Sequence, residues 1–165
     1  MTTNDFIKKL DFEYIETFSL LRELETKDYV DNLQATAKTV QDDSERRRLL
    51  DLTVRGTKRL LIETGTPHPT GQRTNIFKKS DPKIDEFFSI LSEEYTQQYE
   101  FMCWPVFREM IVFYDKSNQI VSLLSICLSC DQIEDEDANR IRTDFKVFDK
   151  LRKYFKDIGH KVERM

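Results

Sequence analysis

The apolar residues in the first third of the chain recur at steps of three and four residues. This spacing places them on one side of a helix and predicts amphipathic helices. The first helix is predicted over about Asn4 to Leu24, the second over about Tyr29 to Val40, and the third from about Ser44 to Leu61. Gly65 then stands where a helix often ends in a left-handed residue. The pattern therefore predicts a helical part over residues 1–65.

The segment from Thr66 to Asn75 is rich in residues that interrupt regular structure. It holds two prolines and one glycine, which is typical of a loop, and it is the predicted boundary between the two halves of the chain. Asp81 and Pro82 then supply a helix N-cap and a first-turn proline. A further helix is therefore predicted over roughly Pro82 to Tyr99.

The pattern changes to that of strands in the second half. Val106 to Tyr114 and Ile120 to Leu128 are dense in Val, Ile, Phe and Leu, and both residue parities are apolar. The polar residues 115–119 between them form a short turn sequence. We therefore expect a β-hairpin that is mostly buried on both faces.

A last amphipathic segment covers about residues 145–158, with Thr143 as a candidate cap and Gly159 at the end. The predicted fold class is α+β, with an N-terminal helical layer packed on a small antiparallel β-hairpin or sheet and a C-terminal helix. The chain has 165 residues, which fits a single domain over 1–165. Its predicted parts are the helices of 1–65, the loop of 66–75, and a helix, hairpin and helix unit of 76–165.

The composition limits the cellular context. The longest uncharged stretch, Ser117 to Cys130, has 14 residues and is too short to cross a bilayer. The sequence begins Met-Thr-Thr-Asn-Asp-Phe-Ile-Lys-Lys-Leu, which lacks the apolar core of a secretory signal. We therefore expect a cytoplasmic protein with no membrane partner, and the sequence leaves its oligomeric state open.

Charge argues against a nucleic-acid partner. Lys and Arg total 26 against 30 Asp and Glu, so the net charge is −4. A nucleic-acid-binding domain normally carries a net basic surface. The arginines of the third predicted helix are therefore interpreted as a solvated helix face. The acidic run from Asp131 to Asp137 is interpreted as the negatively charged start of a helix.

Three cysteines fall near one end of the predicted hairpin. If the hairpin is symmetric about Ser117, the numbers of facing residues sum to about 234, so Cys127 faces Phe107. Cys103 then lies beside Cys130 at the open end. In a chain without a signal sequence, the expected state of these cysteines is three reduced thiols rather than a disulfide framework.

Different interpretations of the cysteines stay open. Cys103, Cys127 and Cys130 are candidate zinc ligands, because a Cys-x-x-Cys pair with a third thiol nearby approaches a tetrahedral sulfur site. His160 is the better placed of two histidines to be the fourth ligand. A redox dithiol is a second interpretation, and simple core packing, with no cofactor at all, is a third.

The order of motifs in this half resembles a group of small uncharacterised bacterial proteins. The residues that carry the resemblance are Cys103-Trp-Pro, Ile111-Val-Phe-Tyr-Asp115, Ile126-Cys-Leu-Ser-Cys130 and the helix from Phe148 to Gly159. The resemblance covers about Cys103 to Val162 and implies no activity. It implies that the three cysteines belong to a shared pattern.

The loop from Thr66 to Asn75 is a second candidate site. Gly71 and the polar residues after it offer donors that could hold an anion, and His68 could act as a general acid or base. The loop matches neither the P-loop nor the dinucleotide-binding fingerprint. A plain connection between the two halves is the alternative interpretation.

No motif assembles a nucleophile, a base and oxyanion donors, so catalytic residues are not assigned. The leading hypothesis is a non-catalytic intracellular protein that binds another protein, in the manner of small inhibitor or immunity proteins. The alternative is a protein with a cysteine-based structural zinc or redox site at the end of the hairpin. A third hypothesis is an enzyme that uses the loop from His68 to Arg73, so enzymatic activity stays an open question.

Overall fold

A computed structural model describes residues 1–20, 23–54, 71–96, 103 and 105–162. The chain divides into two compact units. Met1–Ser19 and Gln72–Met165 make up the first unit, and Leu20–Gly71 make up the second. Each unit is described below by itself.

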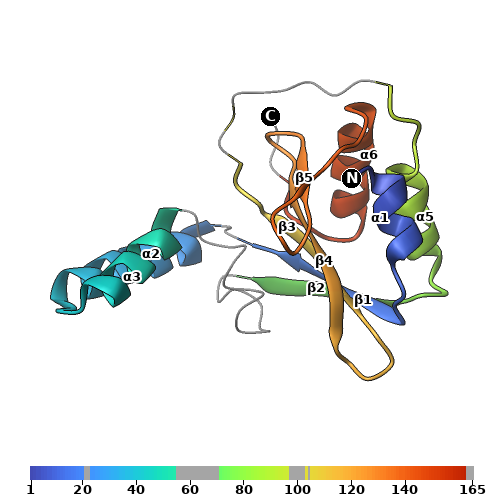
Figure 1. The fold of residues 1–165 in the computed structure, drawn as a ribbon. Helices are drawn as coiled ribbons and strands as arrows, with labels where there is room; N and C mark the ends of the chain where they lie inside the picture. Colours follow the sequence, from blue (N-terminus) through green and yellow to red (C-terminus); the bar gives the residue numbers. More distant parts are fainter. Residues whose placement is uncertain (21–22, 55–70, 97–102, 104, 163–165) are drawn as a thin grey trace. The chain divides into compact units, whose positions relative to one another are not determined.

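The first unit is built on a six-stranded antiparallel sheet with the order β2-β1-β3-β4-β5-β6 (Figure 1). The strands are β1 (Tyr14–Ser19), β2 (Gln72–Lys78), β3 (Glu109–Tyr114), β4 (Ile120–Cys127), β5 (Gln132–Glu134) and β6 (Arg140–Ile141). The predicted hairpin is confirmed as β3 and β4. Its register, in which Ile111 faces Leu124, lies within one residue of the predicted pairing. Most residues of both strands are buried, as expected from their two apolar parities.

Three helices cover one face of this sheet: α1 (Thr3–Lys9), α5 (Pro82–Leu91) and α6 (Lys146–Asp157) (Figure 1). Alternate residues of the strands point toward these helices, because side chains of a strand alternate between its faces. The buried strand residues that join the helices in one apolar core are Ile15, Ile111, Phe113, Leu124, Ile126, Ile133 and Ile141. The α+β class is therefore confirmed for the described residues.

The second unit contains α2 (Glu23–Thr39) and α3 (Asp43–Val54), which pack against each other. Asp42 caps α3, since its carboxylate accepts a hydrogen bond from the backbone N–H of Glu45 at 2.7 Å. The second predicted helix is present but begins at Glu23 rather than about Tyr29, and the third is confirmed as far as Val54. Residues 55–70, which include Gly65, lie outside the described residues.

The predicted first helix is wrong over most of its length. The helix ends at Lys9, and Tyr14–Ser19 form β1, an inner strand next to the β2 edge of the sheet. The apolar positions fit a helical period, but Ile15, Thr17 and Phe18 favour a strand, and two neighbouring strands satisfy the backbone of β1. The local sequence fits both a helix and a strand, and pairing with the two neighbouring strands determines that this segment is a strand.

The other two helices of the first unit are shorter than predicted or capped differently. Asp81 caps α5 as expected, with its carboxylate accepting from Lys83 N–H at 2.8 Å, but the helix ends at Leu91. Thr143 does not cap α6: the N-cap position is Phe145, and the nearby carboxylate of Asp144 accepts from Lys146 N–H at 3.0 Å. Asp144 also accepts a hydrogen bond from the backbone N–H of Thr96 at 3.0 Å, so it ties α6 to the chain after α5.

The acidic run does not begin a helix, because β5 and β6 occupy this segment. Asp135 instead closes the turn between these strands by accepting from Asn139 N–H at 2.8 Å. Glu136 accepts from the hydroxyl of Ser122 at 2.7 Å. Over the described ranges, no helix has the length and apolar content needed to cross a membrane.

Candidate functional site

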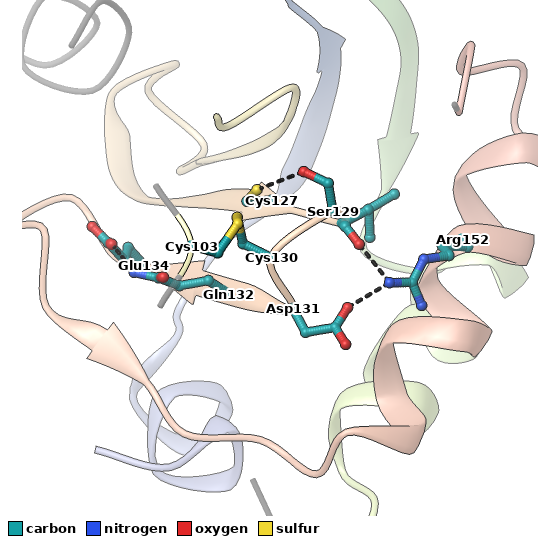
Figure 2. The surroundings of a disulfide bond; sticks show 9 residues. Cys103, Cys127, Ser129, Cys130, Asp131, Gln132, Glu134 and Arg152 are labelled. Carbon is teal, nitrogen blue, oxygen red and sulfur yellow. Dashed lines mark hydrogen bonds and ion pairs between the residues drawn. A yellow bond between two sulfur atoms is a disulfide. The ribbon is translucent and has the colours of Figure 1, made fainter. Parts of the chain in front are cut away.

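The cysteines of the second half meet at the open end of the hairpin, as predicted. Cys127 ends β4, and Cys130 follows in the tight turn that leads into β5. Cys103 and Cys130 form a disulfide with a Cα–Cα distance of 5.8 Å, which is an ordinary separation for such a bond (Figure 2). The expectation that all three thiols are reduced is therefore wrong for this structure.

Cys127 is the remaining free thiol, and it is fully buried. It packs in a small apolar cluster with Phe107 and Cys130. Its Sγ lies 3.3 Å from the hydroxyl oxygen of Ser129 (Figure 2). The free thiol of Cys127 therefore lies in the same packed cluster as Cys130, which is bonded to Cys103.

Arg152 of α6 holds the turn that carries Cys130. Its Nη2 donates to the carbonyl of Leu128 at 2.5 Å and to the carboxylate of Asp131 at 2.5 Å (Figure 2). Burial raises the pKa of the Asp131 carboxyl, and the charge and hydrogen bond of Arg152 oppose that rise. The turn is thus anchored to a helix rather than being a free loop tip.

The zinc interpretation of Cys103, Cys127 and Cys130 gains no support from this arrangement. In the described part of the chain, no group of three or more His, Cys, Asp or Glu side chains is placed to hold a metal ion. Two of the three sulfurs are bonded to each other, so neither offers the thiolate that zinc binds. Zinc binding stays a prediction for the reduced protein.

His160, the proposed fourth zinc ligand, lies in a different network. Its Nδ1 is 2.5 Å from a carboxylate oxygen of Glu109, and its Nε2 is 2.6 Å from the hydroxyl oxygen of Thr74. The side chains of His160 and Glu109 are 0% and 1% exposed, and Thr74 is half-buried. An imidazole therefore bridges a hydroxyl and a carboxylate inside the first unit.

The end of α6 explains the place of His160. Gly159 follows the helix with a φ of 91°, which is the left-handed conformation that glycine adopts without strain. The backbone N–H of His160 then donates to the carbonyl of Phe155 at 2.8 Å, as in a Schellman motif. This turn directs His160 back onto the sheet, where its ring also packs on Phe155.

An irregularity in the sheet explains the place of Thr74. Thr17 faces Asn75 and Phe18 faces Arg73, so Thr74 is an extra residue of β2 that no residue of β1 faces. Such a β-bulge re-aims a side chain locally. Here the Thr74 hydroxyl reaches His160, while the side-chain amide of Asn75 donates to the carbonyl of Ile158 at 2.7 Å.

A hydroxyl next to Thr74 extends the network. The hydroxyl oxygens of Thr17 and Thr74 are 2.7 Å apart, and Asn75 Nδ2 lies 3.4 Å from the Thr17 hydroxyl oxygen. The Thr74 hydroxyl also donates to the carbonyl of Thr17 at 3.1 Å. We refer to the side chains of Thr17, Thr74, Asn75, Glu109 and His160 as the polar corner.

The segment predicted as an anion-binding loop is only partly described. His68 lies outside the described residues, so its role stays a prediction. Residues 72–75 form the start of β2 rather than the end of a loop. The arginine of this segment, Arg73, is paired with Glu16 at 2.7 Å.

The surface also has a recess of about 580 Å³ near the N-terminus. It is lined by apolar residues such as Phe6 and Val121 and by several carboxylates. The turn of each hairpin already uses these acids: Asp115 accepts from the N–H of Gln119 at 2.9 Å, and Asp135 caps the next turn. Asp115 and Asp135 therefore have structural roles in these turns.

Comparison with known proteins does not assign a function to the cysteine cluster or to the polar corner. No family model, no curated protein and no solved structure matches this chain. The resemblance to small bacterial proteins over Cys103 to Val162 therefore stays a prediction. Any function has to follow from the geometry of the chain itself.

Proposed function

We propose that this protein acts by binding another protein, as small inhibitor and immunity proteins do, and that it works in the cytoplasm. The observation that supports this proposal is the position of β2. Among the described strands it is one of the two end strands of the sheet and is hydrogen-bonded to β1 alone. An end strand presents backbone N–H and C=O groups to which an extended segment of a partner can add.

The chemistry of β2 suggests what that segment contains. Arg73, Ile76 and Lys78 face alternate residues of β1, so they lie on one face of the sheet. Ile76 is 53% exposed, and the strand from Gln72 to Lys78 contains cations but no acid. Arg73 is already paired with Glu16, so a complementary partner strand presents an apolar side chain to Ile76 and an acidic one to Lys78.

A designed peptide tests this proposal even while the natural partner is unidentified. The probe is a synthetic peptide of alternating Glu and Val, and the readout is hydrogen–deuterium exchange of the backbone amides of β2. We expect the peptide to slow exchange in Arg73 to Lys78, because edge N–H groups gain acceptors. The same peptide with a central proline is the control, since proline removes one donor and disrupts a strand.

Charge reversal sharpens the test. Lys78→Glu places a like charge opposite the acidic peptide and is expected to abolish the protection, while Lys79→Glu, just after the strand, leaves most of it. Absence of any protection in β2 at millimolar peptide would contradict strand addition. So would protection that is equal for both peptides.

The disulfide favours a second candidate function, a thiol–disulfide site. Cys127 is packed with Cys130, so its thiolate can attack the Cys130 sulfur. A Cys127–Cys130 bond then forms, the Cys103–Cys130 bond breaks, and Cys103 leaves as a thiolate that takes up the proton lost by Cys127. Cys103 is exposed, so an external thiol can reach it. In a cytoplasmic protein, a disulfide is usually transient, catalytic or redox-sensing.

Peptide mapping tests this candidate. We expect native protein to contain the Cys103–Cys130 bond and one free thiol, and to yield three thiols with dithiothreitol in the folded state. Protein held in glutathione buffer should contain a fraction with the Cys127–Cys130 bond, and Cys127→Ala should abolish that fraction alone. Three free thiols in unreduced protein, or a disulfide that resists dithiothreitol until the protein unfolds, would contradict a redox role. Addition of zinc to the reduced protein tests the remaining prediction, which is that Cys103, Cys127 and Cys130 bind this metal.

A further inference from the structure

The polar corner has the connectivity of an activated hydroxyl. The Thr74 hydroxyl contacts Nε2 of the His160 ring, and the Glu109 carboxylate contacts Nδ1 on the opposite side of the ring. A carboxylate that accepts from Nδ1–H fixes the neutral tautomer in which Nε2 is an acceptor. Nε2 can then take a proton from the Thr74 hydroxyl. This is the arrangement in which a histidine, oriented by a carboxylate, acts as the base for a nucleophile.

The contacts of the corner allow a chain of donors that ends on His160. Asn75 donates toward the Thr17 hydroxyl, and the Thr17–Thr74 and Thr74–His160 contacts fit either direction. When the Thr74 proton turns from the Thr17 carbonyl, 3.1 Å away, to His160 Nε2, 2.6 Å away, the Thr17 hydroxyl can donate to Thr74 in turn. Such a chain strengthens its members, because each donor polarises the next. A Thr17 hydroxyl that donates to Thr74 also stabilises negative charge on the Thr74 oxygen.

The position of Thr74 favours a role in a reaction over a role in packing alone. Glu109 and His160 are buried, whereas Thr74 is half-buried on the end strand of the described sheet. Of these three residues, the one that attacks the acyl carbon is thus the one that solvent reaches. The β-bulge that turns Thr74 toward His160 interrupts the regular pairing of β1 and β2. Bulges are over-represented next to active sites, where they re-aim a side chain.

We propose that Thr74 is the nucleophile of an acyl-transfer site, with His160 as its general base and Glu109 as the residue that positions His160. The Thr74 oxygen attacks the carbonyl carbon of an ester or thioester, and its proton passes to His160 Nε2. The bond to the leaving group breaks, and that group takes the proton from His160. Water then attacks the acyl–Thr74 ester, again with His160 as base, and releases the acid.

The geometry also limits the acyl group. Fully buried Thr17 lies against Thr74, and the His160 ring covers another side of the hydroxyl. Because these neighbours crowd the hydroxyl, the expected donor carries a short acyl chain, such as acetyl, on a good leaving group. This activity is independent of strand addition at β2, because it uses a side chain and not the backbone edge.

The test uses p-nitrophenyl acetate as the acyl donor and the full-length protein. Intact mass and peptide mapping should show one acetyl group on Thr74, with release of p-nitrophenol. Hydroxylamine should remove it, because an ester on threonine is cleaved and an amide on lysine is not. Thr74→Val keeps the shape of the side chain and should carry no such label, whereas Thr74→Ser should carry it on the new hydroxyl. Thr36→Val, at an exposed position on α2, should label as the native protein does.

The other two residues have graded effects. His160→Gln should slow acetylation by about 10² or more, as expected for loss of a general base. Glu109→Gln should lower the limiting rate at least about tenfold without changing the donor concentration that gives half of that rate. A purely structural role would not produce this split. An unlabelled Thr74 in native protein would overturn the proposal, as would hydroxylamine-sensitive labelling that is equal in Thr74→Val or in folded His160→Gln.

Discussion

The helix-covered face of the sheet has two regions of different character. In its centre, Phe113 is fully buried among the rings of Phe6, Phe12 and Phe88. At the polar corner, the same face buries a carboxylate and an imidazole. Burial of apolar rings is strongly stabilising, whereas a buried polar or ionic pair is often no more stabilising than apolar residues of the same volume. The difference indicates that the centre maintains the fold and that the corner serves another purpose.

The largest effect is expected in the centre. Phe113→Ala removes a fully buried ring and leaves a cavity among the rings of Phe6, Phe12 and Phe88, so the free energy of unfolding should fall by about 3 to 5 kcal/mol. Chemical denaturation with a constant m-value measures this change. A loss below about 1 kcal/mol would show that the centre is not the main source of stability.

A smaller loss is expected when one partner is removed from the corner. Glu109→Leu leaves the Nδ1–H of buried His160 without the carboxylate that now accepts from it. An unsatisfied buried donor costs about 1 to 3 kcal/mol, and denaturation should show a loss in this range. No loss at all would mean that the two side chains are not coupled in solution.

A still smaller effect is expected at Tyr154 of α6, which tests whether the centre tolerates polar atoms. Its buried hydroxyl has no hydrogen-bond partner among the described residues. Tyr154→Phe removes that group and should raise the free energy of unfolding by up to about 1 kcal/mol. Denaturation at pH 7 measures this change. An increase would show that a buried polar atom costs stability in the centre, and a clear decrease would show that the Tyr154 hydroxyl has a hydrogen-bond partner.

The same variant has a pH signature. Burial, and then the charges of Glu86 and Asp81, raise the pKa of the Tyr154 hydroxyl in the folded state. Unfolded tyrosine loses its proton near a pH of about 10, so stability falls as pH rises above that value. The fall should be shallower in Tyr154→Phe. Identical alkaline denaturation curves for the two proteins would contradict the raised pKa.

Part of the fold can be predicted from local sequence, and the hairpin is the clearest case. Two apolar runs with a polar turn between them determine β3, β4 and their register, because a hairpin depends on residues close in sequence. The strand at Tyr14–Ser19 could not be separated from a helix in this way. Its partners, β2 and β3, lie far along the chain, and the local pattern fits both structures.

The cysteine cluster was predictable for the same reason as the hairpin, although its oxidation state was not. The polar corner could not be assembled from sequence, because Thr74 lies 86 residues from His160 and Glu109 lies 51 residues from it. One signal was present in the sequence: Glu109 is the single charged residue in the apolar strand Glu109–Tyr114. A carboxylate at the start of a buried strand requires a partner, and that requirement is a reason to look for one.

The central claim is that the polar corner serves chemistry rather than stability. The double substitution Glu109→Leu with His160→Leu tests it, because no buried donor or acceptor of this pair remains to be satisfied. The measurement is the free energy of unfolding of the double variant compared with the native protein. The account predicts a difference within about 1 kcal/mol, or a gain, as found when a buried ionic pair is replaced by apolar residues. A loss of about 3 kcal/mol or more would contradict the account and identify the corner as a structural element.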